Sequence, residues 1–372
     1  MRFNQVIGQE DVKTLLRRQA DEGRVPHALL LSGPSGVGKL SMAVALASYL
    51  LCPRHHDGDS CGECPQCSQI DRMSHPDLHF SFPVIRTGSA TTCADYQQEW
   101  RAMTQGGYYF GLDDWLAQMG ADNKQALITE AESDRIISRM SLSSYEGGLK
   151  VMIVWLPERM NAAAANNLLK TLEEPSEGTV FILVSDAPDQ LLSTIISRTQ
   201  QIPMRPLSSD TITQALTERN GIDREAAMQV ARLSQGSYLR ALQLTSVGDT
   251  TKPFFDHFTT LMRAAYSRDL VTLRSWSDEL AGWGRERLKA FLGYCQNMVR
   301  ENFIYNFHRP ELNYMSPDES KFATRFARFI NERNVLQFCD ELSHAQRDIE
   351  QNVNARSMLF DFALHCVILI RR

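Results

Sequence analysis

The sequence lacks an apolar run of membrane-spanning length, since none reaches the roughly 18 residues that such a helix needs. It also lacks a strong charge of either sign: Lys and Arg together number 39, Asp and Glu 44, and the formal net charge is −5. That mild acidity excludes a uniformly basic nucleic-acid coat protein, although it leaves room for a local basic patch. The first ten residues contain no apolar signal region. We therefore expect a cytoplasmic protein without a membrane partner.

Repeats and low-complexity segments are absent as well, and cysteine is sparse, with eight among 372 residues. A chain of this length has room for two or three domains and buries enough apolar surface to be stable without disulfides. Because nothing points to export, the cysteines are expected to be thiols or metal ligands. Three of them, Cys295, Cys339 and Cys366, lie on apolar faces of predicted helices and are expected to be core thiols.

A glycine-rich loop follows the first apolar run. Residues 28–32 (ALLLS) are too few for a helix and suit a buried parallel strand, whereas residues 40–51 have a helical pattern. The segment between them matches the phosphate-binding loop, whose backbone N–H groups surround a polyphosphate and whose lysine reaches the β- and γ-phosphates. The alternative is a tight turn without a ligand. The pattern predicts an ATP or ADP site, or descent from one, formed by Gly33, Ser35, Gly36, Val37, Gly38 and Lys39.

The side chains that would hold Mg²⁺ in such a site are missing. Leu40 replaces the Ser or Thr expected after the lysine, and Ser41 points about 100° away on a helix. Trp155 and Leu156 replace the acid expected after the next core strand, and Glu158 is displaced further along. Because hydrolysis needs the metal to neutralise developing charge, we expect no efficient hydrolysis here. Weak nucleotide binding and no nucleotide binding both stay open.

Four cysteines follow the spacing C-x8-C-x2-C-x2-C within residues 52–67, at Cys52, Cys61, Cys64 and Cys67. Four thiolates suit a tetrahedral Zn²⁺ ion, and the two-residue spacings let neighbouring ligands share a turn. Since all four ligands are protein groups, the predicted zinc is structural and has no open position for chemistry. A redox pair, an iron–sulfur cluster and unrelated free thiols are the competing interpretations.

Strand and helix patterns alternate up to about residue 205, which predicts an α/β domain with a parallel sheet and helices on both faces. Residues 80–130 are irregular and are interpreted as an insertion in that domain. Further helices are expected at 132–143, 161–174 and 191–196, and further strands at 150–156, 180–184 and 200–203. Past residue 205 only helical patterns remain. The predicted division is a nucleotide-binding-like domain at 1–205, a small helical domain at 206–248 and an all-helical domain at 249–372.

Two arginines are candidates for contact with a phosphate. Ser197 and Arg198 follow the last short helix of the α/β domain, and an arginine at such an edge can reach the γ-phosphate of a neighbouring subunit. Arg240 lies in the small helical domain and is a candidate for contact with the chain's own nucleotide. Taken singly, each arginine could equally be a surface salt-bridge residue.

Several segments together resemble the AAA+ subunits of bacterial sliding-clamp loaders, which serve DNA polymerase III. The run from Leu168 to Pro175, with a Ser-Arg pair downstream, is highly specific in combination. The resemblance covers residues 1–245 well and the remainder only as a helical domain. The segments that carry it are Val6-Ile7-Gly8-Gln9, His27-Ala28-Leu29-Leu30-Leu31-Ser32-Gly33, the four-cysteine insert, His75-Pro76-Asp77, Asn166-Asn167-Leu168-Leu169-Lys170-Thr171-Leu172-Glu173-Glu174-Pro175 and Ser197-Arg198.

The resemblance implies an AAA+ core, a small helical lid and a helical collar that joins five subunits into a ring. The implied partners are the motor subunits and the delta subunit of that hetero-pentamer, with the sliding clamp and primer-template DNA reached through the complex. Motor subunits of the family hydrolyse ATP. A non-hydrolysing subunit supplies the arginine of its Ser-Arg pair, here Ser197-Arg198, in trans to a neighbour's ATP site. The missing magnesium ligands favour the non-hydrolysing role.

Other functions are kept as alternatives. An active ATPase motor subunit requires that Ser41 and Glu158 hold Mg²⁺. A zinc-containing DNA-binding module predicts DNA affinity without partners, against which the net charge of −5 argues. A stand-alone kinase-like phosphotransferase lacks a visible substrate base as well as the magnesium ligands.

Overall fold

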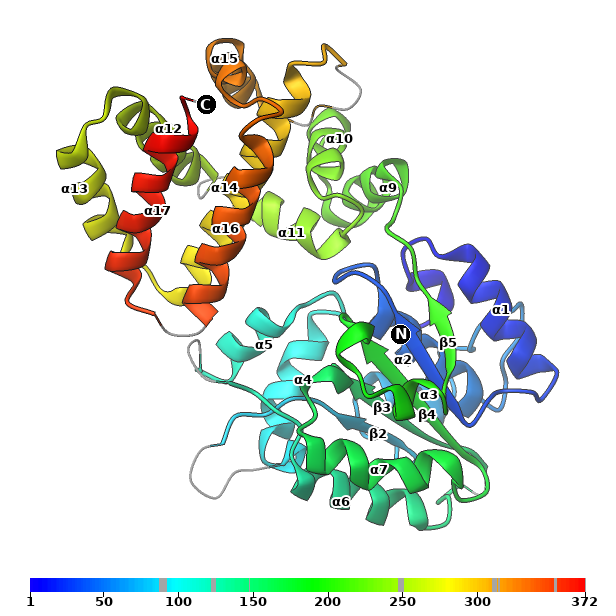
Figure 1. The fold of residues 1–372 in the computed structure, drawn as a ribbon. Coiled ribbons are helices and arrows are strands. Elements are labelled where there is room, and N and C mark those ends of the chain that lie inside the picture. Colours follow the sequence, from blue (N-terminus) through cyan, green and yellow to red (C-terminus); the bar gives the residue numbers. More distant parts are fainter. Residues whose placement is uncertain are drawn as a thin grey trace. The chain divides into compact units, whose positions relative to one another are not determined.

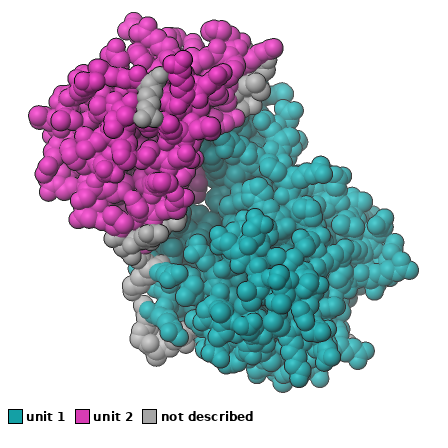
Figure 2. Space-filling view, viewed as in Figure 1, with its two compact units in different colours: residues 1–242 teal, residues 243–372 magenta. Residues whose placement is uncertain are grey.

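The computed structural model describes residues 1–372 except 87–91, 122–124, 147, 247–250, 310–312, 314, 351–352 and 372. The chain forms two compact units, residues 1–242 and residues 243–372 (Figure 2). Among the described residues, no helix is both long and apolar enough to cross a bilayer. The domain boundary predicted at residue 248 lies outside the described residues.

The first unit is built on a five-stranded parallel sheet with the strand order β2-β3-β4-β1-β5 (Figure 1). Strands β1, β3 and β4 are buried along their whole length because helices cover both faces, and they are therefore apolar without alternation. The predicted α/β class is confirmed. The strands are β1 (Ala28–Ser32), β2 (Leu78–Ser81), β3 (Lys150–Trp155), β4 (Thr179–Ser185) and β5 (Gln200–Pro203).

Alternate side chains of the strands enter two separate hydrophobic cores. Leu29 and Leu31 pack with residues of α1 and α2 on one face, and Ala28 and Leu30 pack with residues of α6 and α7 on the other. The helices of the α/β part are α1 (Glu10–Asp21), α2 (Lys39–Leu51), α3 (Pro65–Asp71), α4 (Gln97–Gln105), α5 (Leu112–Gln118), α6 (Glu130–Ser141), α7 (Ala162–Glu173) and α8 (Ser193–Ile196).

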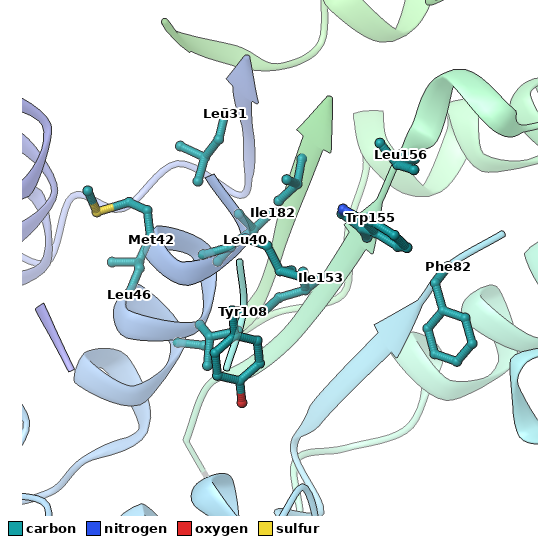
Figure 3. Packing of buried hydrophobic residues seen from close by; sticks show 14 of the residues in the cluster. Leu31, Leu40, Met42, Leu46, Phe82, Tyr108, Ile153, Trp155, Leu156 and Ile182 are labelled. Carbon is teal, nitrogen blue, oxygen red and sulfur yellow. The ribbon is translucent and has the colours of Figure 1, made fainter. Parts of the chain in front are cut away.

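The predicted insertion at 80–130 begins in a strand, because β2 pairs with β3 at the edge of the sheet. The helices α4 and α5 follow, and their aromatic residues form a cluster with the core. Trp100 stacks on Phe82 with ring centroids 4.0 Å apart and lies edge-on to Trp115 at 5.2 Å. Phe82 and Trp155, the last residue of β3, belong to the same hydrophobic cluster (Figure 3). The helices of the insertion are therefore packed onto the sheet.

Three helices follow the sheet and form a small lid around Leu216, Ala227 and Ala241, and the third of them begins in the first unit and ends beyond residue 242. Ile7 and Leu207 join the same core, so the N-terminal segment packs with the lid. Helix α9 is capped by the Ser208 side chain, which accepts the Thr211 N–H. The lid helices are α9 (Ser209–Asn220), α10 (Arg224–Leu233) and α11 (Tyr238–Ser246).

The second unit is helical in its described residues and has its own core. Cys295 and Cys366 are buried there and Cys339 is partly buried, which agrees with their prediction as core thiols. Asn334 is a buried polar residue whose Nδ2 donates to the carbonyl oxygens of Phe329 and Leu369 at 2.8 and 3.0 Å. The helices are α12 (Thr251–Ser267), α13 (Leu270–Leu280), α14 (Arg285–Tyr305), α15 (Pro317–Phe326), α16 (Val335–Glu350) and α17 (Ala355–Leu369).

Candidate functional site

The glycine-rich loop connects the end of β1 to the start of α2. Gly33, Gly36 and Gly38 have φ angles of +148°, +81° and +94°, a range that favours glycine. The space around them is equally restrictive. A Cβ on Gly36 would lie 2.1 Å from Ser237 Oγ, and one on Gly33 would lie 2.2 Å from the Met204 carbonyl oxygen. The chain around Met204 and Ser237 therefore packs closely against this loop.

Lys39 turns back onto its own loop. Its Nζ donates hydrogen bonds to the carbonyl oxygens of Gly33 at 2.7 Å and Pro34 at 2.5 Å, and it forms an ion pair with Asp186 Oδ1 at 2.7 Å. An ammonium group has three N–H donors, so these partners occupy all of them. The Lys39 side chain is only 3% exposed. Burial lowers the pKa of Lys39, and the Asp186 carboxylate opposes that shift.

Asp186 is a site residue that the sequence patterns did not predict. It directly follows β4, which pairs with β1, so its carboxylate reaches the loop that follows β1. Glu158 fixes the turn that carries it, since Glu158 Oε1 accepts the backbone N–H groups of Asp186 and Ala187 at 2.9 and 3.2 Å. The sequence signal that could have identified Asp186 is its position, since it is an acidic residue immediately after a core strand.

The positions where a phosphate loop would hold Mg²⁺ are taken by buried residues. Leu40 and Leu156 lie in hydrophobic core, at the start of α2 and after the end of β3 (Figure 3). Trp155 packs against Trp100 with ring centroids 5.5 Å apart. These apolar side chains offer no oxygen to a metal ion. Ser41, the displaced hydroxyl, is fully buried in the first turn of α2.

The lid touches the loop directly through the start of α11. The Tyr238 N–H donates to the Gly36 carbonyl oxygen at 3.0 Å, and Leu239 Cβ would lie 2.7 Å from a Cβ on Gly36. Arg240 is on the same helix, but its guanidinium donates to Gln235 Oε1 at 3.1 Å. Burial lowers the pKa of Arg240. Among the described contacts, no hydrogen bond joins this guanidinium to the loop.

The two other predicted loop residues differ in exposure. Ser35 is exposed to solvent, whereas Val37 is fully buried. The Val37 carbonyl oxygen accepts a hydrogen bond from Gln9 Nε2 at 3.4 Å, and the same Nε2 donates to the Arg205 carbonyl oxygen at 2.7 Å. Gln9 belongs to the Val-Ile-Gly-Gln segment that carries part of the family resemblance, and its role here is to join the loop to the chain after β5.

The four predicted zinc ligands converge. The Sγ atoms of Cys52, Cys61, Cys64 and Cys67 lie within 4.8 Å of one another, at 3.6 Å from Cys52 to Cys61 and 3.9 Å from Cys61 to Cys67. Thiolates bound about 2.3 Å from a tetrahedral zinc ion lie about 3.8 Å apart. The donor set and its spacing therefore fit a structural Zn²⁺ ion, and four protein ligands leave no position open for a substrate.

Backbone N–H groups surround these sulfur atoms. The N–H of Cys61 donates to Cys52 Sγ, that of Cys64 to Cys61 Sγ and that of Cys67 to Cys64 Sγ, each with an N···S distance of 3.4 Å. The N–H groups of Glu63 and Cys64 lower the pKa of the Cys61 thiol to about 6. Such donors favour the thiolate, which is the form that binds a metal ion.

The cysteine module is tied to the N-terminal segment of the chain. The Asp59 carboxylate accepts the backbone N–H groups of Phe3 and Asn4 at 3.0 and 2.9 Å. Phe3 is fully buried and its ring lies 5.6 Å from that of Tyr49 on α2. Through the N-terminal segment, the module is therefore connected to α2, the helix that follows the phosphate loop.

Arg198 projects from the chain just after α8 and is half-buried. Its Nε and Nη2 donate to Glu173 Oε2 at 3.0 and 2.7 Å, and its Nη1 donates to the Thr194 carbonyl oxygen at 3.0 Å. The Arg198 and Glu173 side chains are 30% and 57% exposed, so the ion pair faces solvent. Ser197 is exposed, and its Oγ donates to the same Thr194 oxygen at 3.2 Å.

Comparison with known proteins gives one family and a set of relatives. A family model described as "DNA polymerase III, delta subunit" matches residues 8–208. A DNA polymerase III subunit delta' from Bacillus subtilis is 32% identical over 212 residues, which are 57% of this chain and 52% of that protein. A DNA polymerase III subunit tau/gamma from Haemophilus influenzae is 25% identical over 378 residues, which are 95% of this chain and 48% of that protein.

The chain spans about half the length of these curated relatives. A solved DNA polymerase III gamma subunit-related protein from Thermotoga maritima covers 96% of this chain and 99% of its own. Its sequence identity to this chain is 14% and the TM-score is 0.39.

A phosphate loop after the first strand of a β2-β3-β4-β1-β5 parallel sheet, followed by a small helical lid, defines an AAA+ protein of the P-loop class. Within that class, the four-cysteine insert and the Ser-Arg pair are among the features by which the sequence resembles clamp-loader subunits. The chain belongs to the DNA polymerase III delta subunit family of clamp-loader proteins. The expectation from the family resemblance is confirmed at that level.

Proposed function

We propose that this chain is the non-hydrolysing, delta-prime-type subunit of a bacterial sliding-clamp loader, and that it supplies Arg198 in trans to a neighbouring motor subunit's ATP site. The observation that carries this proposal is a contrast between two cations. Lys39, in the chain's own loop, has all three donors occupied within the chain. Arg198 is 30% exposed, and the carboxylate of its ion pair, on Glu173, faces solvent. Relatives named subunit delta' support the proposal.

The chemistry of the proposed role follows from the guanidinium group. Its planar fork of N–H donors matches the oxygens of a phosphate, and its permanent charge stabilises the negative charge that develops during phosphoryl transfer. Ser197, the other member of the pair, holds the turn before Arg198 through its bond to the Thr194 carbonyl oxygen. The apolar residues Leu40, Trp155 and Leu156 support the absence of hydrolysis at the chain's own loop.

The remaining parts of the proposal concern assembly. Residues 1–205 would be the AAA+ core, 206–248 the lid and 249–372 the collar that joins the five-subunit ring. The four cysteines would hold a structural Zn²⁺ ion, whose contribution is to fix the 52–67 segment and not to take part in chemistry. The partners would be the motor and delta subunits, with the sliding clamp and primer-template DNA contacted through the complex, in the cytoplasm.

An active motor subunit is the second candidate, because a relative named tau/gamma matches 95% of this chain. It would need Ser41 and Glu158 to hold Mg²⁺. Ser41 is fully buried, and one carboxylate oxygen of Glu158 already accepts two backbone N–H groups. The ATPase activity of the purified chain separates the two candidates.

The test uses the reconstituted loader with Arg198→Ala in this chain and Arg24→Ala as the matched control, since Arg24 is a 79% exposed arginine of the same domain. Loss of an arginine finger slows the affected site on the order of 10³-fold. We expect Arg198→Ala to reduce DNA-stimulated ATPase and clamp loading without changing assembly, and Arg24→Ala to change neither. Unchanged rates with Arg198→Ala would remove the trans role. Magnesium-dependent hydrolysis by the chain alone, abolished by Lys39→Ala, would establish the motor instead.

A further inference from the structure

The insertion places a tyrosine against the phosphate loop. Tyr109 Oη accepts a hydrogen bond from the backbone N–H of Ile7 at 2.9 Å. The same oxygen lies so close to Gly38 that a Cβ there would meet it at 2.8 Å. The Tyr109 ring packs edge-on against Tyr238, at the start of α11, with ring centroids 5.0 Å apart. Tyr109 therefore contacts the N-terminal segment, the loop and the lid at once.

The next two residues extend this contact to the sheet. The Phe110 ring packs edge-on against Trp155, the last residue of β3, with centroids 5.2 Å apart. A Cβ on Gly111 would lie 3.3 Å from Leu239 Cδ2 in the lid. The segment 109–111 thus touches the last glycine of the loop, the end of β3 and the first turn of α11.

This is the place where a ligand would be expected. In α/β proteins with parallel sheets, ligands bind outside the carboxyl ends of the strands. Gly38 and Trp155 both lie at that edge, and the segment 109–111 contacts both. A nucleotide at the loop would have to displace Tyr109 from Gly38 and the Ile7 N–H. Its phosphates would also have to displace Asp186 from Lys39.

We propose that the segment 109–111 is a resident occupant of the phosphate-loop site, and that it takes the place of a nucleotide in joining the α/β core to the lid. This assigns a role to the insertion, and it predicts a core–lid contact that does not respond to ATP or ADP. The inference rests on the proposed function only for the absence of hydrolysis at this loop. The role of Arg198 is independent of it.

The first experiment measures ADP binding to the full-length chain by calorimetry, with and without Mg²⁺. The wild type is expected to bind no ADP up to millimolar concentration. Tyr109→Ala opens the site, so its ADP affinity is expected to exceed that of the wild type by at least about tenfold, the factor that corresponds to about 1.4 kcal/mol. Adding Lys39→Ala should abolish that gain. The control is Tyr145→Ala, which truncates an 82% exposed tyrosine and should gain nothing.

Two results of this titration would overturn the inference: micromolar ADP binding by the wild type that depends on Lys39, or a folded Tyr109→Ala chain with no gain. Either result leaves the Arg198 proposal standing, because that proposal is tested by the ATPase of the assembled loader. Conversely, an unaffected Arg198→Ala loader would leave the resident-occupant inference intact.

The second experiment uses hydrogen exchange and needs no cavity-forming variant. Tyr109→Phe removes only the hydroxyl that accepts the Ile7 N–H, so the Ile7 amide should exchange about fivefold to tenfold faster. Tyr108→Phe is the matched control, because the neighbouring hydroxyl contacts Met73 Sδ and, within the described part of the chain, no backbone amide. An unchanged Ile7 amide in Tyr109→Phe, or protection of wild-type loop amides by added ADP, would contradict the occupancy.

Discussion

Asp186→Asn isolates the charge that holds Lys39. The asparagine keeps an acceptor oxygen at the same place, and the backbone N–H of residue 186 keeps its bond to Glu158. Removing one partner of a buried ion pair costs about 3–5 kcal/mol, but the Asp186 side chain is 30% exposed and Lys39 keeps two carbonyl partners. A loss of about 1–3 kcal/mol is therefore expected after allowance for solvent screening.

Thermal unfolding measures this loss in the first unit. For a unit of 242 residues, a change of about 1–3 kcal/mol corresponds to a fall in Tm of roughly 2–12 °C. Asp189→Asn is the matched control, because Asp189 is exposed in the same turn and has no ion pair among the described contacts. Equal melting temperatures for the two variants would refute the dependence of Lys39 on Asp186.

The pH dependence has a definite sign. The pKa of Lys39 is already below its usual value in the folded chain, and loss of the Asp186 carboxylate lowers it further. Between the folded and unfolded pKa values the unfolded chain binds more protons, so stability rises with pH there. The destabilisation by Asp186→Asn is therefore largest at neutral pH and decreases as pH rises toward the usual lysine pKa of about 10.4. A loss that grows with rising pH would contradict this account.

The remaining predictions concern the cysteine module and Asp77, a buried residue that precedes β2 and contacts residues 144–146. The purified, reduced chain should hold one zinc ion by elemental analysis, and Cys61→Ser should lower both the zinc content and the Tm; a well-folded chain without zinc would refute the assignment. Asp77→Asn should cost about 1–3 kcal/mol in urea unfolding, because the buried carboxylate accepts the N–H groups of Tyr145 and Glu146 and the Ser144 hydroxyl. Burial raises the pKa of Asp77, but the three donors outweigh it, so the pKa is lowered overall. The difference in unfolding free energy between Asp77→Asn and the wild type should therefore shrink below about pH 4.

Features that depend on residues close together in the sequence could be predicted from the sequence. The strands β1, β3 and β4 are continuous apolar runs, because a sheet covered on both faces needs no alternation. The spacing of the four cysteines in the sequence predicts that their side chains converge, as they do in the structure. Strand β2 was not predicted, because it has only four residues, Leu78–Ser81, of which the middle two are partly exposed and one is a histidine.

Features that depend on distant segments could not be predicted in this way. The run Gly106-Gly107-Tyr108-Tyr109-Phe110-Gly111 has the composition of a loop, and nothing in it indicates a partner. Tyr109 meets Ile7 across 102 positions of the chain, and only the folded insertion brings them together. The pairing of Lys39 with Asp186 depends likewise on the hydrogen-bonded register of β1 and β4, since each residue follows one of these strands.

Solvent exposure distinguishes Lys39 from Arg198 as a cation available to another molecule. Both Lys39 and Arg198 are paired with a carboxylate at 2.7 Å, so distance does not distinguish them. The Arg198–Glu173 pair faces solvent, where such pairs contribute about 0–1 kcal/mol and are weakened by salt. A phosphate can therefore replace Glu173 at little cost. The Lys39 side chain is 3% exposed and hydrogen-bonded to its own loop, so a phosphate there must break an ion pair whose ammonium group is buried, and must move Tyr109. That difference supports a subunit that keeps its lysine for its own fold and presents its arginine to a neighbour.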